Sequence, residues 1–363
     1  MTYNPLAVPE VAAAIKSGKR GAYAYVVYSD GSGSFDTSSA RGFEVISERS
    51  QTGVESVATH NRIVSTKRDA KGARRYRDVR GRFVAMKLAT NEAFAIITPE
   101  TGDYIRDGLV RFLYRLRSKI TRARLKSVEM LRIVESLAGA TNTDVVIKRS
   151  LLRSKRQEAT ISYKAETLDT LYEVAQENNA HVQGFDFALQ KRDGDILLHA
   201  GLKRNGQISY RAGNLDLFIK QFVEAVARTV KLRTDMLSGR ARSEQTGIVK
   251  PLKIKFAENL FDRDENVRAF LRTLGKIKHG EMTLYHRNPY LHASFFDFFD
   301  NSEVDVFLDA TDSLVLVPQF DSTRSSLFRL CQKIFEEFEE GELTEGEGIV
   351  TSSSSSDRPD DDS

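Results

Sequence analysis

The chain has 363 residues, of which 40% are hydrophobic and 29% charged, and its formal net charge is +4. This length predicts two or three compact domains, and the composition excludes disorder over the whole chain. No apolar run reaches the roughly 18–20 residues of a membrane span, and no secretory signal pattern opens the chain. Cys331 is the only cysteine, which excludes an internal disulfide framework. We therefore expect a cytoplasmic protein with no cofactor, no metal site and no membrane partner.

The near-neutral total charge conceals two opposed blocks. Residues 62–160 hold 24 basic and 10 acidic residues, a net charge of +14, whereas residues 293–363 hold 4 basic and 18 acidic residues, a net charge of −14. Such asymmetry is typical of a chain with a polyanion-binding surface and an acidic tail. The alternative is that each block is a solvated surface without a partner.

The N-terminal part of the chain predicts an antiparallel meander followed by one long basic helix, together forming a first domain over 1–140. An Ala-rich segment, 4–17, predicts a short helix. Apolar residues at helical spacing between Thr101 and Leu137 predict the long helix. Between the two helices, β-type runs separated by turn residues occur at 22–28, 42–48, 54–65, 82–89 and 93–97.

The rest of the chain predicts one strand–helix–meander–helix sandwich unit used twice, over 141–238 and 248–340. The run Leu197-Leu198-His199-Ala200-Gly201 in the first corresponds to Tyr290-Leu291-His292-Ala293-Ser294 in the second, which suggests an internal duplication. Residues 341–363 are acidic and Ser-rich, and we expect a disordered tail there. The predicted fold class is therefore α+β: a β-meander with a long helix, then two related α/β sandwiches.

The first of two basic elements in the positive block is the segment 67–82, KRDAKGARRYRDVRGR. It lies between two predicted strands, so we expect an Arg-rich hairpin. The planar guanidinium group suits bidentate contact with phosphate, and Tyr76 could stack on a base or sugar. The candidate nucleic-acid-binding residues of this hairpin are Lys67, Arg68, Arg74, Arg75, Arg77, Arg80 and Arg82.

The second basic element is a ladder of cations along the predicted long helix. Three- and four-residue intervals place them within about 80° of one another on the helix surface. Like charges at this spacing repel by roughly 0.2–0.5 kcal/mol per pair, so a polyanion lying across them would explain their presence. The ladder consists of Arg111, Arg115, Lys119, Arg122 and Lys126.

The sequence contains no zinc-finger spacing, RNP-type strand or other familiar nucleic-acid module. We therefore expect non-catalytic binding of DNA or RNA, mainly through contacts to the phosphate backbone. A protein-interaction subunit with charged faces is an alternative.

Histidine motifs provide an enzymatic alternative. His292-Ala293-Ser294-Phe295 has the form His–apolar–Ser–apolar and resembles the motif of the two-histidine phosphoesterases, in which paired motifs act on a phosphodiester. The counterpart His199-Ala200-Gly201 lacks the hydroxyl group. The resemblance implies His199, His292 and Ser294 as the catalytic residues of a phosphodiester-processing enzyme.

Overall fold

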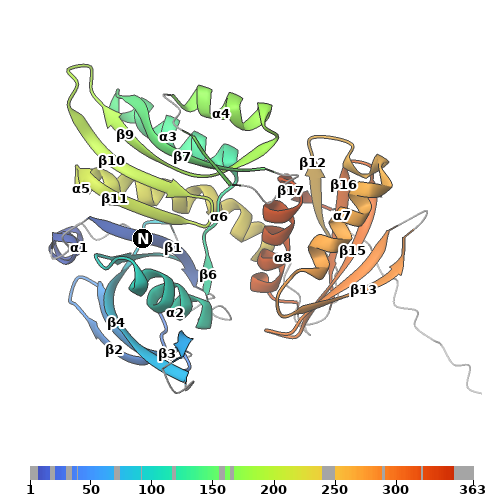
Figure 1. Cartoon of the computed structure of the whole chain (residues 1–363), viewed down its shortest axis with the longest axis horizontal. Coiled ribbons are helices and arrows are strands. Elements are labelled where there is room, and N and C mark those ends of the chain that lie inside the picture. Colours follow the sequence, from blue (N-terminus) through green and yellow to red (C-terminus); the bar gives the residue numbers. More distant parts are fainter. Residues whose placement is uncertain are drawn as a thin grey trace, which may run out of the picture. The chain divides into compact units, whose positions relative to one another are not determined.

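The computed structural model describes residues 7–16, 21–29, 35–38, 40–68, 74–90, 92–116, 120–154, 160–163, 167–238, 250–287, 291–319 and 322–346. The chain folds into two compact units, Met1–Leu232 and Arg233–Ser363, and residues in each unit contact mainly other residues of the same unit. Helices and antiparallel sheets are mixed in each unit, which confirms the predicted α+β class (Figure 1). The finer division of the chain at 140 and 248 stays a prediction.

One antiparallel sheet organises the first unit. Its strands follow the order β2-β3-β4-β5-β1-β11-β10-β9-β7-β8, and β6 pairs with β1 beside this path. Strands β2 to β5 are consecutive neighbours, which confirms the predicted meander, and β1 continues the sheet beyond β5. The strands are β1 (Ala22–Ser29), β2 (Glu44–Arg49), β3 (Glu55–Arg68), β4 (Arg74–Lys87), β5 (Ala93–Thr98), β6 (Ile120–Arg122), β7 (Asp144–Ser154), β8 (Thr160–Tyr163), β9 (Ala180–Gln190), β10 (Ile196–Lys203) and β11 (Gln207–Gly213).

Helices of the first unit pack on both faces of this sheet. They are α1 (Ala7–Lys16), the π-helix η1 (Tyr104–Leu109), α2 (Val110–Arg115), α3 (Ser127–Thr141), α4 (Leu168–Glu177), α5 (Leu215–Leu217), the π-helix η2 (Phe218–Val223) and α6 (Glu224–Ser238). Helix α1 confirms the predicted N-terminal helix over residues 7–16, and the predicted residues 4–6 and 17 lie outside the described part of the chain.

Strand pairing assigns each residue of the sheet to one of two faces, because side chains alternate along a strand. On the first face, the rings of Phe187 and Phe222 meet at 5.4 Å and the Tyr28 hydroxyl donates to the Ala227 carbonyl, so η2 and α6 lie against it. We call it the α6 face. One row of paired residues on this face crosses β4, β5, β1, β11 and β10 and consists of Val84, Ile97, Ala24, Ile208 and Leu202.

The opposite face is covered by η1 and α2 where it is formed by β3, β4, β5 and β1, and we call it the α2 face. Phe112 is fully buried there, with its ring 5.4 Å from the rings of Phe43 and Phe83. Tyr104 lies over Gly81, where a Cβ atom would come within 2.4 Å of the tyrosine ring. The Tyr104 hydroxyl also hydrogen-bonds to Thr59 Oγ1 at 2.9 Å. Helix η1 is therefore seated directly on the meander.

The prediction of one long helix over 101–137 is wrong. The helical segment η1–α2 ends at Arg115, and the chain then enters β6, which pairs antiparallel with β1 through Val27 and Arg122. A second helix, α3, begins at Ser127, where the Lys126 N–H donates to the Glu129 carboxylate at 2.7 Å. Local spacing favoured one helix because Ile120 follows Leu116 by four residues, but the sheet satisfies the backbone of 120–122 instead.

The second unit is a six-stranded antiparallel sheet with the order β13-β14-β15-β16-β12-β17. Phe256 of β12 and Phe270 of α7 both contact Phe261, at 5.8 and 5.7 Å, so α7 covers one face of the sheet. The elements are β12 (Leu252–Phe256), the 3-10 helix η3 (Leu260–Asp262), α7 (Asp264–Gly275), β13 (Gly280–His286), β14 (His292–Asp297), β15 (Ser302–Ala310), β16 (Ser313–Pro318), α8 (Arg324–Glu337) and β17 (Gly341–Glu345).

Two expectations for the second unit meet different outcomes. Residues 341–345 were expected in the disordered tail, but they form β17, because their backbone pairs with β12 and places Leu343 opposite Ile254. Residues 347–363 lie outside the described part of the chain. The element order agrees with the predicted repeat, although β7 pairs with β9 whereas β12 pairs with β16 and β17. The internal duplication stays a prediction.

Within the described ranges, no helix has the length and the apolar character needed to cross a membrane.

Candidate nucleic-acid interface

The predicted basic hairpin is formed by β3 and β4, which pair as far as Arg68 and Arg74. Most of its arginines lie in strand β4 rather than at a tip, so alternate residues point to opposite faces. Arg80 and Arg82 share the α6 face with Val84, whereas Arg77 lies on the α2 face. The structure describes the backbone of the following four residues but not their side chains: Lys67, Arg68, Arg74 and Arg75.

An ion-pair network holds Arg77 against η1. Its guanidinium donates to Asp103 and, at 2.6 Å, to Asp107 Oδ2. Asp107 also accepts from Arg106 Nη2 at 3.0 Å and lies 3.5 Å from Arg111 Nη2. Burial alone would raise the pKa of Asp107, but these cations outweigh burial and hold its pKa below the ordinary value. Arg77 and Arg111 are therefore partly neutralised within the protein.

The predicted ladder does not form one stripe, because its members lie on three different elements. Arg115 ends α2, where it is exposed and has no ion pair among the described side chains. Arg122 lies on β6, with its guanidinium 5.6 Å from the centre of the Tyr25 ring. Lys126 is the N-cap residue of α3. Lys119 lies outside the described residues.

His60 bridges three strands on the α6 face, beside Arg80. Its Nδ1 atom is 2.9 Å from the Glu44 carboxylate of β2, and its Nε2 atom is 3.4 Å from the Asp78 carboxylate of β4. The hydrogen bond to Glu44 is the largest cause that raises the pKa of His60 above 6.5.

We expect a pH effect with a definite sign from this bridge. Because the folded-state pKa is raised, the stabilisation is complete below the unfolded-state value of about 6.5 and is lost as the pH rises through the folded-state value. An NMR titration of the His60 ring should show a midpoint above 6.5, lowered more by Glu44→Gln than by Asp78→Asn. A midpoint unchanged in Glu44→Gln would contradict this account.

A second group of cations gathers where the α2 face is open, on β7, β9, β10 and β11. Arg149, Asp186, Gly201 and Ser209 are paired in one row across these strands. His199 and Lys203 flank Gly201 on β10 and therefore share its face, on either side of Asp186. We define the basic sheet face by its charged and titratable residues, which are Lys148, Arg149, Asp186, His199, Lys203 and Arg211.

Gly201 allows this arrangement because it has no side chain. A Cβ atom at this position would come within 2.1 Å of Asp186 Oδ1 and 2.6 Å of Ser209 Oγ. The Asp186 carboxylate therefore lies close over the β10 backbone, between His199 and Lys203. Among the residues that define the basic sheet face, Asp186 is the carboxylate beside four permanent cations.

The cations of the basic sheet face remain largely unneutralised. Lys148, Arg149 and Arg211 are exposed, and no described carboxylate forms an ion pair with them. Arg211 instead lies over the ring of Tyr23, 5.6 Å from its centre. Lys203 Nζ donates to Gln207 Oε1 at 3.0 Å. The net charge of this face is therefore about +3 when His199 is neutral.

Burial, with a smaller contribution from neighbouring cations, lowers the pKa values of two groups on the basic sheet face. Burial lowers the pKa of His199; Asp186 opposes this effect, and Arg211 and Lys148 add to it. Displacement of water from the Lys203 ammonium group lowers its pKa as well, again opposed by Asp186 and reinforced by Arg211. Bringing one more anion to this face would relieve the repulsion among its cations.

Lys148 and Arg149 belong to the positive block of residues 62–160, whereas Lys203 and Arg211 lie outside it and were not predicted from the sequence. A signal existed, because His199 and Lys203 alternate along β10 with the buried residues Leu198, Ala200 and Leu202. Alternation of this kind indicates a strand with one solvent-facing side. Its neighbours in space, however, depend on pairing that no local pattern encodes.

The enzymatic alternative places its residues in different units. His199 lies on β10 of the first unit, whereas His292 and Ser294 share one face of β14 in the second. The His292 ring stacks on Phe307 at 4.3 Å, and its Nε2 atom is 3.9 Å from Asp305 Oδ1. The Ser294 hydroxyl donates to Glu303 at 2.6 Å. The role of these residues in catalysis stays a prediction.

No cluster of three or more His, Cys, Asp or Glu residues in the described ranges is arranged to hold a metal ion. No protein-family model matches the chain, and its comparison with curated protein sequences finds no significant match.

Proposed function

We propose that this protein binds nucleic acid without acting on it chemically, through contacts between its cations and the phosphate backbone. The observation that carries the proposal is the basic sheet face, where Lys148, Arg149 and Arg211 have no ion pair among the described residues. Exposed cations gathered on one face are the electrostatic footprint of a polyanion-binding surface. Arg80 and Arg115, which are also exposed, extend the proposal to the predicted hairpin and helix.

The dimensions of the basic sheet face fit a nucleic-acid backbone. Neighbouring strands lie about 4.8 Å apart, so the three intervals from β7 to β11 span roughly 14 Å. Duplex DNA places one phosphate per strand every 3.4 Å along its axis, so about four phosphates pass over this distance. Among the described residues, Tyr23 is the aromatic side chain seen in contact with these cations, which favours phosphate contact over base stacking.

The test is a salt-dependent binding panel with the full chain and labelled double- and single-stranded DNA and RNA. Affinity should fall steeply between about 50 and 200 mM salt, with a log–log slope near −0.9 per contacted phosphate for a duplex and −0.7 for a single strand. Changing the base sequence should alter affinity little, because phosphates carry no sequence information. Binding that is absent at low salt, or independent of salt, would contradict the proposal.

A further inference from the structure

Helix α1 lies over β4 and β5 on the α6 face and is fixed there by polar and apolar contacts. The Glu10 carboxylate accepts hydrogen bonds from Ser50 Oγ at 2.8 Å and Thr52 Oγ1 at 2.7 Å. Val11 and Ile15 are buried, with exposed fractions of 0% and 4%. These contacts hold the helix in place without filling the space beside its alanines.

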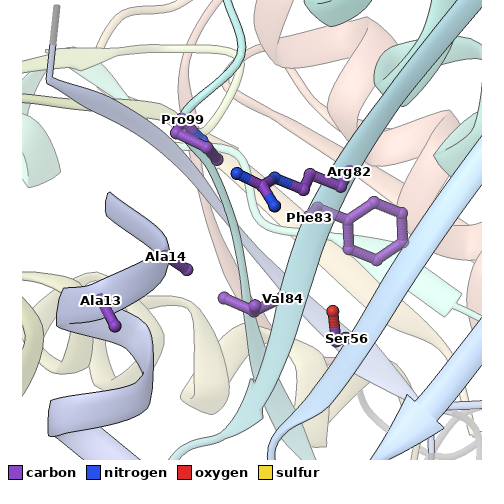
Figure 2. A pocket seen from close by; sticks show the side chains of 7 residues that line it. All are labelled: Ala13, Ala14, Ser56, Arg82, Phe83, Val84 and Pro99. Atoms are coloured by element: carbon purple, nitrogen blue, oxygen red, sulfur yellow. The ribbon is translucent and has the colours of Figure 1, made fainter. Parts of the chain in front are cut away.

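A pocket of about 250 Å³ remains between α1 and β4. Figure 2 shows Arg82 and Val84 pointing from β4 toward the helix, with the guanidinium beside Pro99, whereas the ring of Phe83 points away. The pocket is open because the side chains on its other walls are small. Its lining residues are Ala13, Ala14, Ser56, Arg82, Phe83, Val84 and Pro99.

The lining has a simple chemical character. Arg82 contributes a guanidinium group that stays protonated, Ser56 contributes a hydroxyl group, and no carboxylate is among the described residues of the lining. The remaining side chains are apolar. The volume corresponds to about eight water molecules at roughly 30 Å³ each, which is below the usual range of drug-sized sites. The pocket therefore suits a compact apolar body that carries one anionic group.

We propose that this pocket binds a small organic anion, whose carboxylate or phosphate group pairs with Arg82 while its apolar body contacts Ala14 and Val84. A guanidinium fork recognises either group through two parallel hydrogen bonds. The site lies on the α6 face, whereas the basic sheet face belongs to the α2 face of the same sheet. The proposal therefore does not depend on nucleic-acid binding at the basic sheet face.

Benzoate, phenyl phosphate and the neutral analogue benzyl alcohol are suitable probes, titrated into the full chain and followed by calorimetry or NMR. At least one of the two anions should bind, and at least about tenfold more tightly than benzyl alcohol, because a charge-assisted hydrogen bond distinguishes them. Binding of benzoate alone identifies a carboxylate ligand, and binding of phenyl phosphate alone identifies a phosphate monoester. The proposal fails if neither anion binds, or if benzyl alcohol binds as tightly as the anions.

Two variants and one matched control locate the binding. Arg82→Gln should weaken anion binding at least about tenfold, because it removes the charge. Ala14→Leu should abolish binding by filling the pocket while it leaves the charge in place. Arg62→Gln removes an exposed cation from the same sheet face outside the lining, and affinity should change less than about twofold. Unchanged affinity in either pocket variant would overturn the proposal.

Discussion

Replacing Lys148, Arg149 and Arg211 together by alanine should weaken nucleic-acid binding about 100-fold at roughly 0.15 M salt. Each residue is expected to neutralise one phosphate, and each such contact contributes about 0.9 to the slope of log affinity against log salt. At roughly 0.15 M salt, the loss of three contacts therefore lowers log affinity by about two. The same loss should reduce the slope of log affinity against log salt by about 2.7 for a duplex. Fluorescence anisotropy over a salt series measures both quantities.

The matched control removes three exposed cations from the second unit, in the variant Lys255→Ala, Arg272→Ala and Lys278→Ala. It changes the net charge equally, so long-range attraction alone would weaken binding equally in both variants. A loss confined to the first variant locates the contacts on the basic sheet face. Equal losses, or no loss in the first variant, would contradict the assignment of this surface.

The charge pattern of the sequence correctly predicted a positive surface, but it did not predict which residues form that surface. Counting charge along the chain treats every cation as available, yet Arg77 and Arg106 are held by Asp103 and Asp107. Asp103 is 26 residues from Arg77 in the sequence. Its proximity depends on η1 packing over the meander, which a local charge count does not include.

Strand pairing explains why two cations of the basic sheet face were not predicted from the charge pattern. Lys203 and Arg211 lie outside the positive block of 62–160, but β7, β9, β10 and β11 are neighbours in the sheet. Pairing therefore brings these two residues to the same face as Arg149. Within a single strand the opposite happens, since Arg77 and Arg80 are close in sequence but belong to opposite faces.

Periodicity predicted the core around α2 correctly even though it predicted the wrong helix. Leu109, Phe112 and Leu116 are among the apolar residues at helical spacing between Thr101 and Leu137, and all three are fully buried. Apolar residues at helical spacing form the buried face of a helix. This rule applies to a short helix as well as to a long one. The break before β6 was missed because Ile120 is buried in either arrangement, as part of a helix or paired with Ser29 of β1.

Because it removes a ring from this core, Phe112→Ala should destabilise the first unit much more than the nearby substitution Tyr114→Ala. Phe112 is fully buried between the rings of Phe43 and Phe83, and truncating a phenylalanine in such a site costs about 3–5 kcal/mol, because apolar contacts are lost and a cavity remains. At about 2–4 °C per kcal/mol for a unit of this size, calorimetry should show the melting of the first unit lowered by roughly 6–20 °C. Tyr114→Ala, two residues away on α2 and 46% exposed, is the matched control and should change stability by less than about 0.5 kcal/mol. Equal shifts in the two variants would mean that α2 does not seal the core of the meander.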